Sequence, residues 1–323
     1  MPQKMSSFEI GQVPKRHPYL LADLVELCLP FLAYDELSKS DVETLIREGD
    51  LDADEDLDSN IARPGESSAE KIDKEFSWVE DCFMQLQYRE AAFDSSYPFR
   101  IGDGSVLTWK ANLTDEMILY LFLLVCSRLR SFPQGKCQLL ASVFEKVSRE
   151  AMKELLPSSA FVRIFGANSY DRQTYYGTGI SDALRKLGID LKEDVIERNI
   201  LQETGTGDGG LDLVAYLSFE DPARGSLALF GQCAAQQYDW PKKVLEAHPL
   251  RFSSWLSFCH SPGNIVFIPL CYRQANGEWV KNSPSNGCVL LDRLRICKLL
   301  RGRSVLQEIR DILATGELAI ARE

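Results

Sequence analysis

The sequence has few histidines, no C-x-x-C pair and no long apolar run, and each shortage excludes a class of protein. Three histidines stand among 323 residues, so a zinc site built from several histidines is not expected. The number of cysteines, nine, is odd, and no two of them form a C-x-x-C pair, which argues against a disulfide framework. The longest strongly apolar stretch, residues 117–126, is about half as long as a membrane-spanning helix requires.

The first residues also lack the apolar segment of a secretory signal peptide. Without such a signal, the cysteines are expected to be reduced thiols in a cytoplasmic protein that makes no membrane contact. Hydrophobic residues make up 45% of the chain and charged residues 26%, which is the balance of a globular protein. The length favours two domains or one elaborated domain.

Charge is distributed unevenly along the chain. The whole sequence carries 36 basic and 47 acidic residues, a net charge of −11. Residues 1–157 contain 17 basic and 28 acidic residues, whereas residues 158–323 contain 19 of each. The acidic half is therefore expected to contact a protein partner or to self-associate, because its charge repels phosphate. The neutral half, with local basic clusters, is compatible with nucleic-acid binding.

Residues 1–135 are predicted to form an acidic, mostly helical N-terminal region. Apolar residues at helical spacing, with capping residues at the starts, predict helices over 18–34, 40–48, 73–92 and 114–131. A hairpin is expected within residues 98–110, with its turn at Gly102-Asp103-Gly104. Residues 49–71 are acidic and nearly free of large apolar side chains, which predicts a mobile loop.

Residues 136–323 are predicted to form an α/β domain. Short apolar and β-branched segments predict strands at 161–166, 211–219, 226–234, 264–272 and 287–292. Helices are expected over 135–156 and 180–188, from about residue 241, and twice near the C-terminus. Strands interspersed with helices indicate a mixed sheet with helices on its faces.

The densest chemical signal is the segment G-D-G-G-L-D-L-V-A at residues 207–215. Its paired glycines allow a tight entry into an apolar strand, and Asp212 opens that strand. Gln232 stands near the end of the next strand, so antiparallel pairing would bring the two polar side chains together. Polar groups at the ends of buried strands are costly unless they bind something. Mg²⁺ would take oxygen ligands from Asp212, from Gln232 and from a backbone carbonyl such as that of Cys233.

The D-G-G-x-D segment, the hairpin and the G-Q-C strand end together resemble the PD-(D/E)xK, or restriction-endonuclease-like, nuclease superfamily. The similarity is closest to Mrr-like enzymes, which carry Gln in place of the second carboxylate. The resemblance implies a core over residues 138–300: a helix, a three-stranded meander with the acidic residues, another helix and a further strand. It also implies Asp212 and Gln232 as ligands of Mg²⁺ or Mn²⁺. The superfamily sometimes adds a Glu from its first core helix, but residues 180–188 contain none.

One position departs from the family pattern. The family's lysine would stand two residues after Gln232, where this sequence has Ala234. Related nucleases relocate the lysine to the following helix, and D-W-P-K-K at 239–243 offers Lys242 and Lys243. The W-x-x-K spacing favours Lys243, which would stabilise the charge that develops on the phosphate.

A basic cluster near the C-terminus is the candidate for phosphate contact, the alternative being a solvated helix face. Its members are Arg293, Arg295, Lys298 and Arg301.

Taken with the resemblance, these features predict a Mg²⁺-dependent nuclease acting on DNA, the effector of a bacterial restriction or anti-phage system. The rival hypothesis is a degenerate nuclease fold that serves as a nucleic-acid-binding or assembly subunit, and Ala234 favours it.

Overall fold

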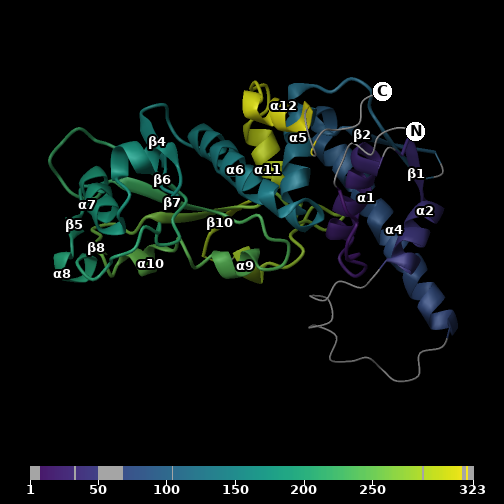
Figure 1. Ribbon diagram of the computed structural model, residues 1–323, viewed down its shortest axis with the longest axis horizontal. Helices are drawn as coiled ribbons and strands as arrows, with labels where there is room; N and C mark the ends of the chain where they lie inside the picture. The colour runs from purple at the N-terminus through teal and green to yellow at the C-terminus, as the bar shows by residue number, and fades with distance from the viewer. Residues whose placement is uncertain are drawn as a thin grey trace.

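The structure of the chain is a computed structural model that describes residues 8–32, 34–49, 68–103, 105–285, 287–314 and 318 (Figure 1). It is a mixed α/β protein, as the sequence predicts. Most of the loop expected over residues 49–71 lies outside the described residues.

A five-stranded mixed sheet forms the centre of the C-terminal region, with the strand order β10-β9-β7-β6-β4. β4, β6 and β7 form an antiparallel meander, and β7, β9 and β10 run parallel. Each strand lies within or beside a segment predicted to be one. The bounds are β4 (Ala160–Ile164), β6 (Leu213–Leu217), β7 (Leu227–Cys233), β9 (Gly263–Phe267) and β10 (Val289–Leu291).

Helices cover both faces of this sheet, because the side chains of each buried strand alternate between the two faces. Leu213 of β6 points into the same core as Val147 of α6 (Gln134–Glu154). Val214, its neighbour, packs on the opposite face with α7 (Ile180–Leu191) and α10 (Pro249–Phe252). Between β7 and β9 the chain forms α9 (Trp240–Lys243), a single helical turn at the place where a helix is expected from about residue 241. Shorter elements beside α7 are β5 (Asp194–Val195), α8 (Glu197–Ile200) and β8 (Leu256–Ser257).

The N-terminal region is mostly helical, as predicted, and carries a small sheet of order β1-β3-β2. β2 and β3 are the expected hairpin, whereas β1 has three residues and is too short to show a pattern in the sequence. Ser38 caps α2, two residues before the cap expected at Ser40. The bounds are α1 (Pro18–Leu32), β1 (Glu36–Ser38), α2 (Lys39–Glu48), α4 (Ser68–Phe93), β2 (Phe99–Gly102), β3 (Val106–Trp109) and α5 (Asp115–Cys126).

One hydrophobic core is continuous across the junction expected at residues 135 and 136. It joins Leu24 and Leu124 of the N-terminal region to Phe144 of α6 and Ile296 of α11 (Arg293–Leu299). α11 and α12 (Gln307–Ala314) both pack on α5, although they follow it by more than 160 residues. The apolar run at 117–126 is buried in this core. Among the described residues, no helix has both the length and the apolar character that crossing a membrane requires.

Four fully buried charged side chains connect α1, α4 and α11. Arg89 Nη1 lies 2.7 Å from Asp23 Oδ1 and 2.9 Å from Glu26 Oε2. Arg293 Nη2 lies 2.9 Å from the other oxygen of Asp23. The prediction that Arg293 contacts phosphate is therefore wrong, because its side chain is 0% exposed and is already paired.

Candidate functional site

Asp212 and Gln232 meet at one end of the β6–β7 hairpin, as the sequence predicts. Leu213 and Gly231 form the last pair of the antiparallel register, and Asp212 and Gln232 are the next residue on each chain segment. The Asp212 N–H donates to the Gly231 carbonyl at 3.0 Å, and the Cys233 N–H donates to Asp212 Oδ2 at 2.7 Å. Asp212 is 9% exposed and Gln232 5% exposed. The three residues predicted to ligate a cation are thus adjacent at the sheet edge where β7 ends.

The turn before Asp212 depends on two glycines and an aspartate. Gly209 and Gly210 have φ values of +69° and +87°, in the region that favours glycine. Asp208 Oδ1 accepts a hydrogen bond from the Gly210 N–H at 2.8 Å, so this side chain shapes the turn. A Cβ on Gly210 would lie 3.0 Å from the Glu246 carbonyl oxygen, which means that the turn packs closely on the segment after α9.

Glu145 of α6 joins the site, and the sequence reasoning missed it. Gly166 follows β4, and a Cβ there would lie 3.1 Å from Glu145 Oε2, so the glycine makes room for this carboxylate. The N–H groups of Phe165 and Gly166 donate to the Asp212 carbonyl, which ties the end of β4 to the start of β6. On the sequence alone, a Glu is considered within residues 180–188, but α6 is the helix that precedes the first strand of the meander. The order of the elements, with α6 directly before β4, was therefore the signal in the sequence that could have identified Glu145.

The carboxylates of this site crowd one another in a buried place. Burial raises the pKa of Asp212 well above its usual range, and the Glu145 and Asp208 carboxylates add to the rise. The positive charge of Lys243 and the Cys233 N–H act in the opposite direction. Burial, with help from Asp208, also raises the pKa of Glu145 to about 7. A cation bound here would relieve this repulsion.

The two lysines of α9, Lys242 and Lys243, differ in their surroundings. Its charge acts on Asp212, and its Nζ donates to Glu246 Oε2 at 2.8 Å. Lys242 pairs with Asp239 on the solvent side, and its side chain is 82% exposed.

Ala234, where the family pattern has lysine, is 2% exposed and packs in one apolar cluster with Trp240. Its small side chain allows α9 to lie against the strand end, and this contact brings Lys243 to the site.

The donor set fits a divalent cation. Gln232 Oε1 is buried and accepts no hydrogen bond from the residues that the structure describes, which leaves its lone pairs for a ligand. Within that part of the chain, no three His, Cys, Asp or Glu side chains are grouped so that they could hold a metal by themselves. A cation beside Asp212 would therefore need the Gln232 amide or a backbone oxygen as well.

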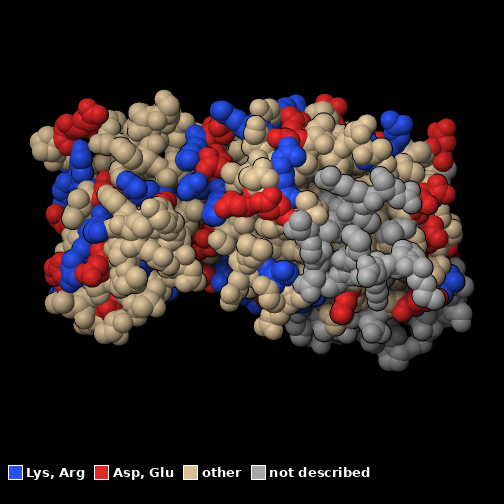
Figure 2. Space-filling view, turned by 45° about the horizontal axis from the view of Figure 1, so that its top comes forward, with Lys and Arg blue, Asp and Glu red and all other residues tan. Residues whose placement is uncertain are grey.

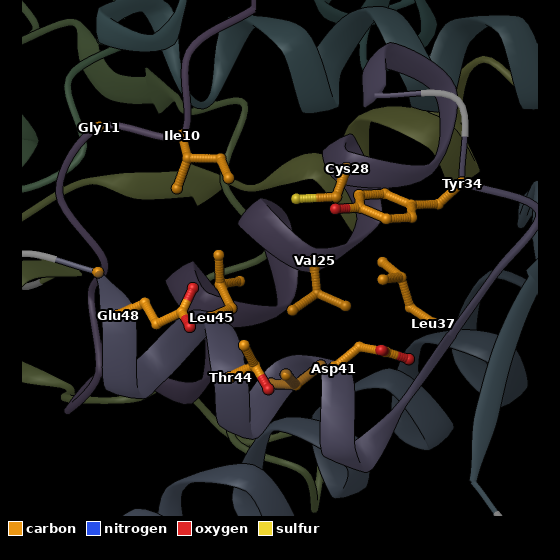
Figure 3. A pocket seen from close by; sticks show the side chains of 12 residues that line it. Ile10, Gly11, Val25, Cys28, Tyr34, Leu37, Asp41, Thr44, Leu45 and Glu48 are labelled. Carbon is orange, nitrogen blue, oxygen red and sulfur yellow. The ribbon is translucent and has the colours of Figure 1, made fainter.

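A pocket of about 420 Å³ lies elsewhere, between residues 10–11, α1 and α2 (Figure 3). Val25, Cys28 and Leu37 belong to its apolar lining, and the charged residues among its described lining are Asp41 and Glu48. Because it contains acidic groups and no described cation, this pocket does not suit a phosphate.

The remaining members of the predicted basic cluster are on the surface. Arg295 and Lys298 lie on α11 and Arg301 follows it, and all three are exposed. Figure 2 shows basic and acidic side chains interspersed on the visible face rather than separated into large areas of one sign. On this face, the cations that could contact phosphate are therefore dispersed among carboxylates.

Comparisons with known proteins do not assign the chain to a family. No protein-family model matches the chain, and no curated protein or solved structure matches it. The functional argument consequently depends on the geometry of the site.

Proposed function

We propose that this protein is a metal-dependent nuclease that hydrolyses phosphodiester bonds, with DNA as the substrate. The observation that carries the proposal is a buried Asp212 at one edge of the sheet. The charges of Glu145 and Lys243 act on its carboxylate, and Gln232 lies near the end of the neighbouring strand. The element order gives further support. The resemblance to restriction-endonuclease-like nucleases implies a helix, a three-stranded meander, another helix and a further strand. The chain has α6, then β4, β6 and β7, then α9 and β9 in that order, with α7, β5 and α8 inserted between β4 and β6 and with α10 and β8 inserted before β9.

Each residue has a role that follows from its place. Asp212 and Gln232, joined by Glu145, would hold Mg²⁺ or Mn²⁺ through oxygen atoms. A divalent cation, when bound, polarises the phosphate and promotes attack by water. Lys243 would lie against the phosphate oxygens and stabilise their growing negative charge. Its ion pair with Glu246 limits the range of positions of the ammonium group.

The choice of DNA and the setting come from the resemblance alone. Enzymes of that kind act in bacterial restriction and anti-phage defence, and we extend that setting to this chain as part of the proposal. Arg295, Lys298 and Arg301 are the exposed cations that would bind the phosphates beyond the reacting one.

A catalytically degenerate subunit is the second candidate, because Ala234 stands where the family pattern has lysine. In that case the fold would bind nucleic acid or a partner without cleaving it. The two proposals differ in whether Lys243 and Asp212 affect a reaction.

Asp212→Asn is expected to abolish Mg²⁺-dependent nicking of plasmid DNA. The substitution keeps an oxygen that can accept the Cys233 N–H but removes the ligand charge. It also removes repulsion from Glu145 and Asp208, so the melting temperature without metal should stay equal or rise.

The matched control is Asp182→Asn on α7, an exposed carboxylate that pairs with Arg185, which should leave nicking unchanged. Plasmid nicking and thermal unfolding would be measured on the same preparations, with RNA as a second substrate. Cleavage at the wild-type rate by folded Asp212→Asn would reject the site, and a wild-type chain that binds but never cleaves would favour the degenerate subunit.

A further inference from the structure

Trp279 contacts two arginines beyond the end of β9. The guanidinium carbon of Arg273 is 4.4 Å from the centroid of the Trp279 ring, and that of Arg295 is 4.8 Å from it. An isolated β-bridge joins Arg273 to Trp279, so the loop between them is closed on itself. The indole is half-buried. Planar guanidinium groups stack well on an indole, which holds each of them in a fixed orientation.

The two arginines differ in what else they contact. Arg273 donates to both oxygens of the buried Asp292, at 2.7 Å and 3.2 Å, and its charge is thereby neutralised. Arg295 is exposed and forms no ion pair with the residues that the structure describes. Its Nη1 donates to the Leu290 carbonyl at 2.7 Å, which leaves Nε and Nη2 available. The cluster therefore presents one oriented, uncompensated guanidinium to the solvent.

The Arg295 residue comes shortly after the end of β10, at the same edge of the sheet as the candidate site. Cys233 of β7 pairs with Phe267 of β9, and Phe267 pairs with Leu291 of β10, so the three strands end in a row. Arg295 stands four residues after Leu291, in the first turn of α11. Three strand spacings separate β6, which Asp212 opens, from β10, or about 14 Å. That length matches the rise of about four base pairs along a duplex.

We propose that Arg295 binds a backbone phosphate about four nucleotides from the one held at Asp212, and that Trp279 is the residue that positions it. This inference depends on the proposed nuclease function and names a second contact to the same substrate. A guanidinium that already has its orientation loses little freedom on binding a phosphate and can use its two remaining donor groups together.

The test is the salt dependence of DNA binding by the full chain, measured by fluorescence anisotropy with a labelled duplex in EDTA, where cleavage cannot proceed. Arg295→Gln should lower the slope of log affinity against log salt by about 0.9, the loss of one phosphate contact. Trp279→Leu should lower it by a similar amount, and the double variant by no more than either single one. Trp279→Phe, which retains an aromatic face, should keep most of the wild-type slope.

Arg185→Gln is the control, because that half-buried arginine on α7 already pairs with Glu197 and its substitution should leave the slope unchanged. If wild-type binding depends on salt but Arg295→Gln has the wild-type slope, the second contact is wrong while the nuclease proposal stands. If Trp279→Leu weakens binding without changing the slope, or unfolds while Trp279→Phe loses the slope, the positioning role is wrong. Absence of both binding and cleavage in the wild type would instead reject the proposed function.

Discussion

The position of the candidate catalytic lysine depends on an alanine. In the family pattern the lysine is a residue of the strand itself, but here that position is occupied by Ala234, which is buried beside Trp240. A lysine in this apolar cluster would have to be buried or to displace the indole. Ala234 and Trp240 pack together, which brings the first turn after the strand close to the sheet, and the positive charge of Lys243 in this turn acts on Asp212.

Lys243→Ala should consequently reduce DNA cleavage by about 10²-fold or more, because a fixed positive charge at a reacting phosphate contributes several kcal/mol. Lys242→Ala is the matched control on the next residue, and it should retain nearly full activity because its side chain points to solvent. Single-turnover cleavage at saturating Mg²⁺ separates the two variants. Equal rates for both would reject the relocated lysine.

The sequence predicted the residues of the site that neighbouring strands bring together. Asp212 and Gln232 could be paired from the register of one hairpin, which is local information. Glu145 could not be found in the same way, because it depends on which helix precedes β4. Arg293 resembled an exposed basic residue on a short helix, and only its distant partner Asp23, 270 positions earlier, explains its burial.

At the scale of elements, the tight turn before β6 controls the direction in which Asp212 points. Gly210 combines a positive φ with close contacts to Glu246 and Arg251. A side chain at this position would strain the backbone and push the turn away from the segment that carries Lys243.

Gly210→Ala is expected to destabilise the protein by about 1–2 kcal/mol, from the strained φ and the crowded Cβ. It should also lower cleavage, because Asp212 and Lys243 would move apart. Gly207→Ala in the same turn is the control, since a Cβ there meets no other atom within 4 Å. Urea unfolding and plasmid nicking give the two readouts. A Gly210→Ala protein with wild-type stability and activity would show that the turn tolerates a side chain.

Helices and strands were predicted correctly where the residues of one continuous segment are enough to form them. All five strands of the main sheet and the hairpin of β2 and β3 follow from apolar alternation and turn residues. β1 was missed because its three residues form a strand only by pairing with β3, about 70 positions later. The helix expected from residue 241 is a single turn, α9, and a second short helix, α10, and the strand β8 follow it before β9 begins.

At the scale of the whole molecule, part of the acidity of the N-terminal region is used inside the chain. Asp115 at the start of α5 pairs with Arg310 of α12, and Glu116 accepts the Gly302 N–H at 2.9 Å. Asp23 and Glu26 hold Arg293 at the start of α11. These contacts bind the C-terminal helices to the N-terminal region. The acidic surface that remains is the part for which a protein partner stays a prediction.

A single unfolding transition is therefore expected for the full chain. Arg293 should contribute strongly to the free energy of unfolding, because it joins the two regions. Arg293→Met would leave Asp23 and Glu26 buried with Arg89 alone, and removing one partner of a buried ion network costs about 3–5 kcal/mol. Urea unfolding followed by both tryptophan fluorescence and circular dichroism measures the loss. Arg303→Met is the control, because Arg303 forms an exposed ion pair with Glu154, and such pairs contribute below about 1 kcal/mol. Two separate transitions in the wild type, or equal small losses in both variants, would mean that the regions fold independently and that the buried network does not join them.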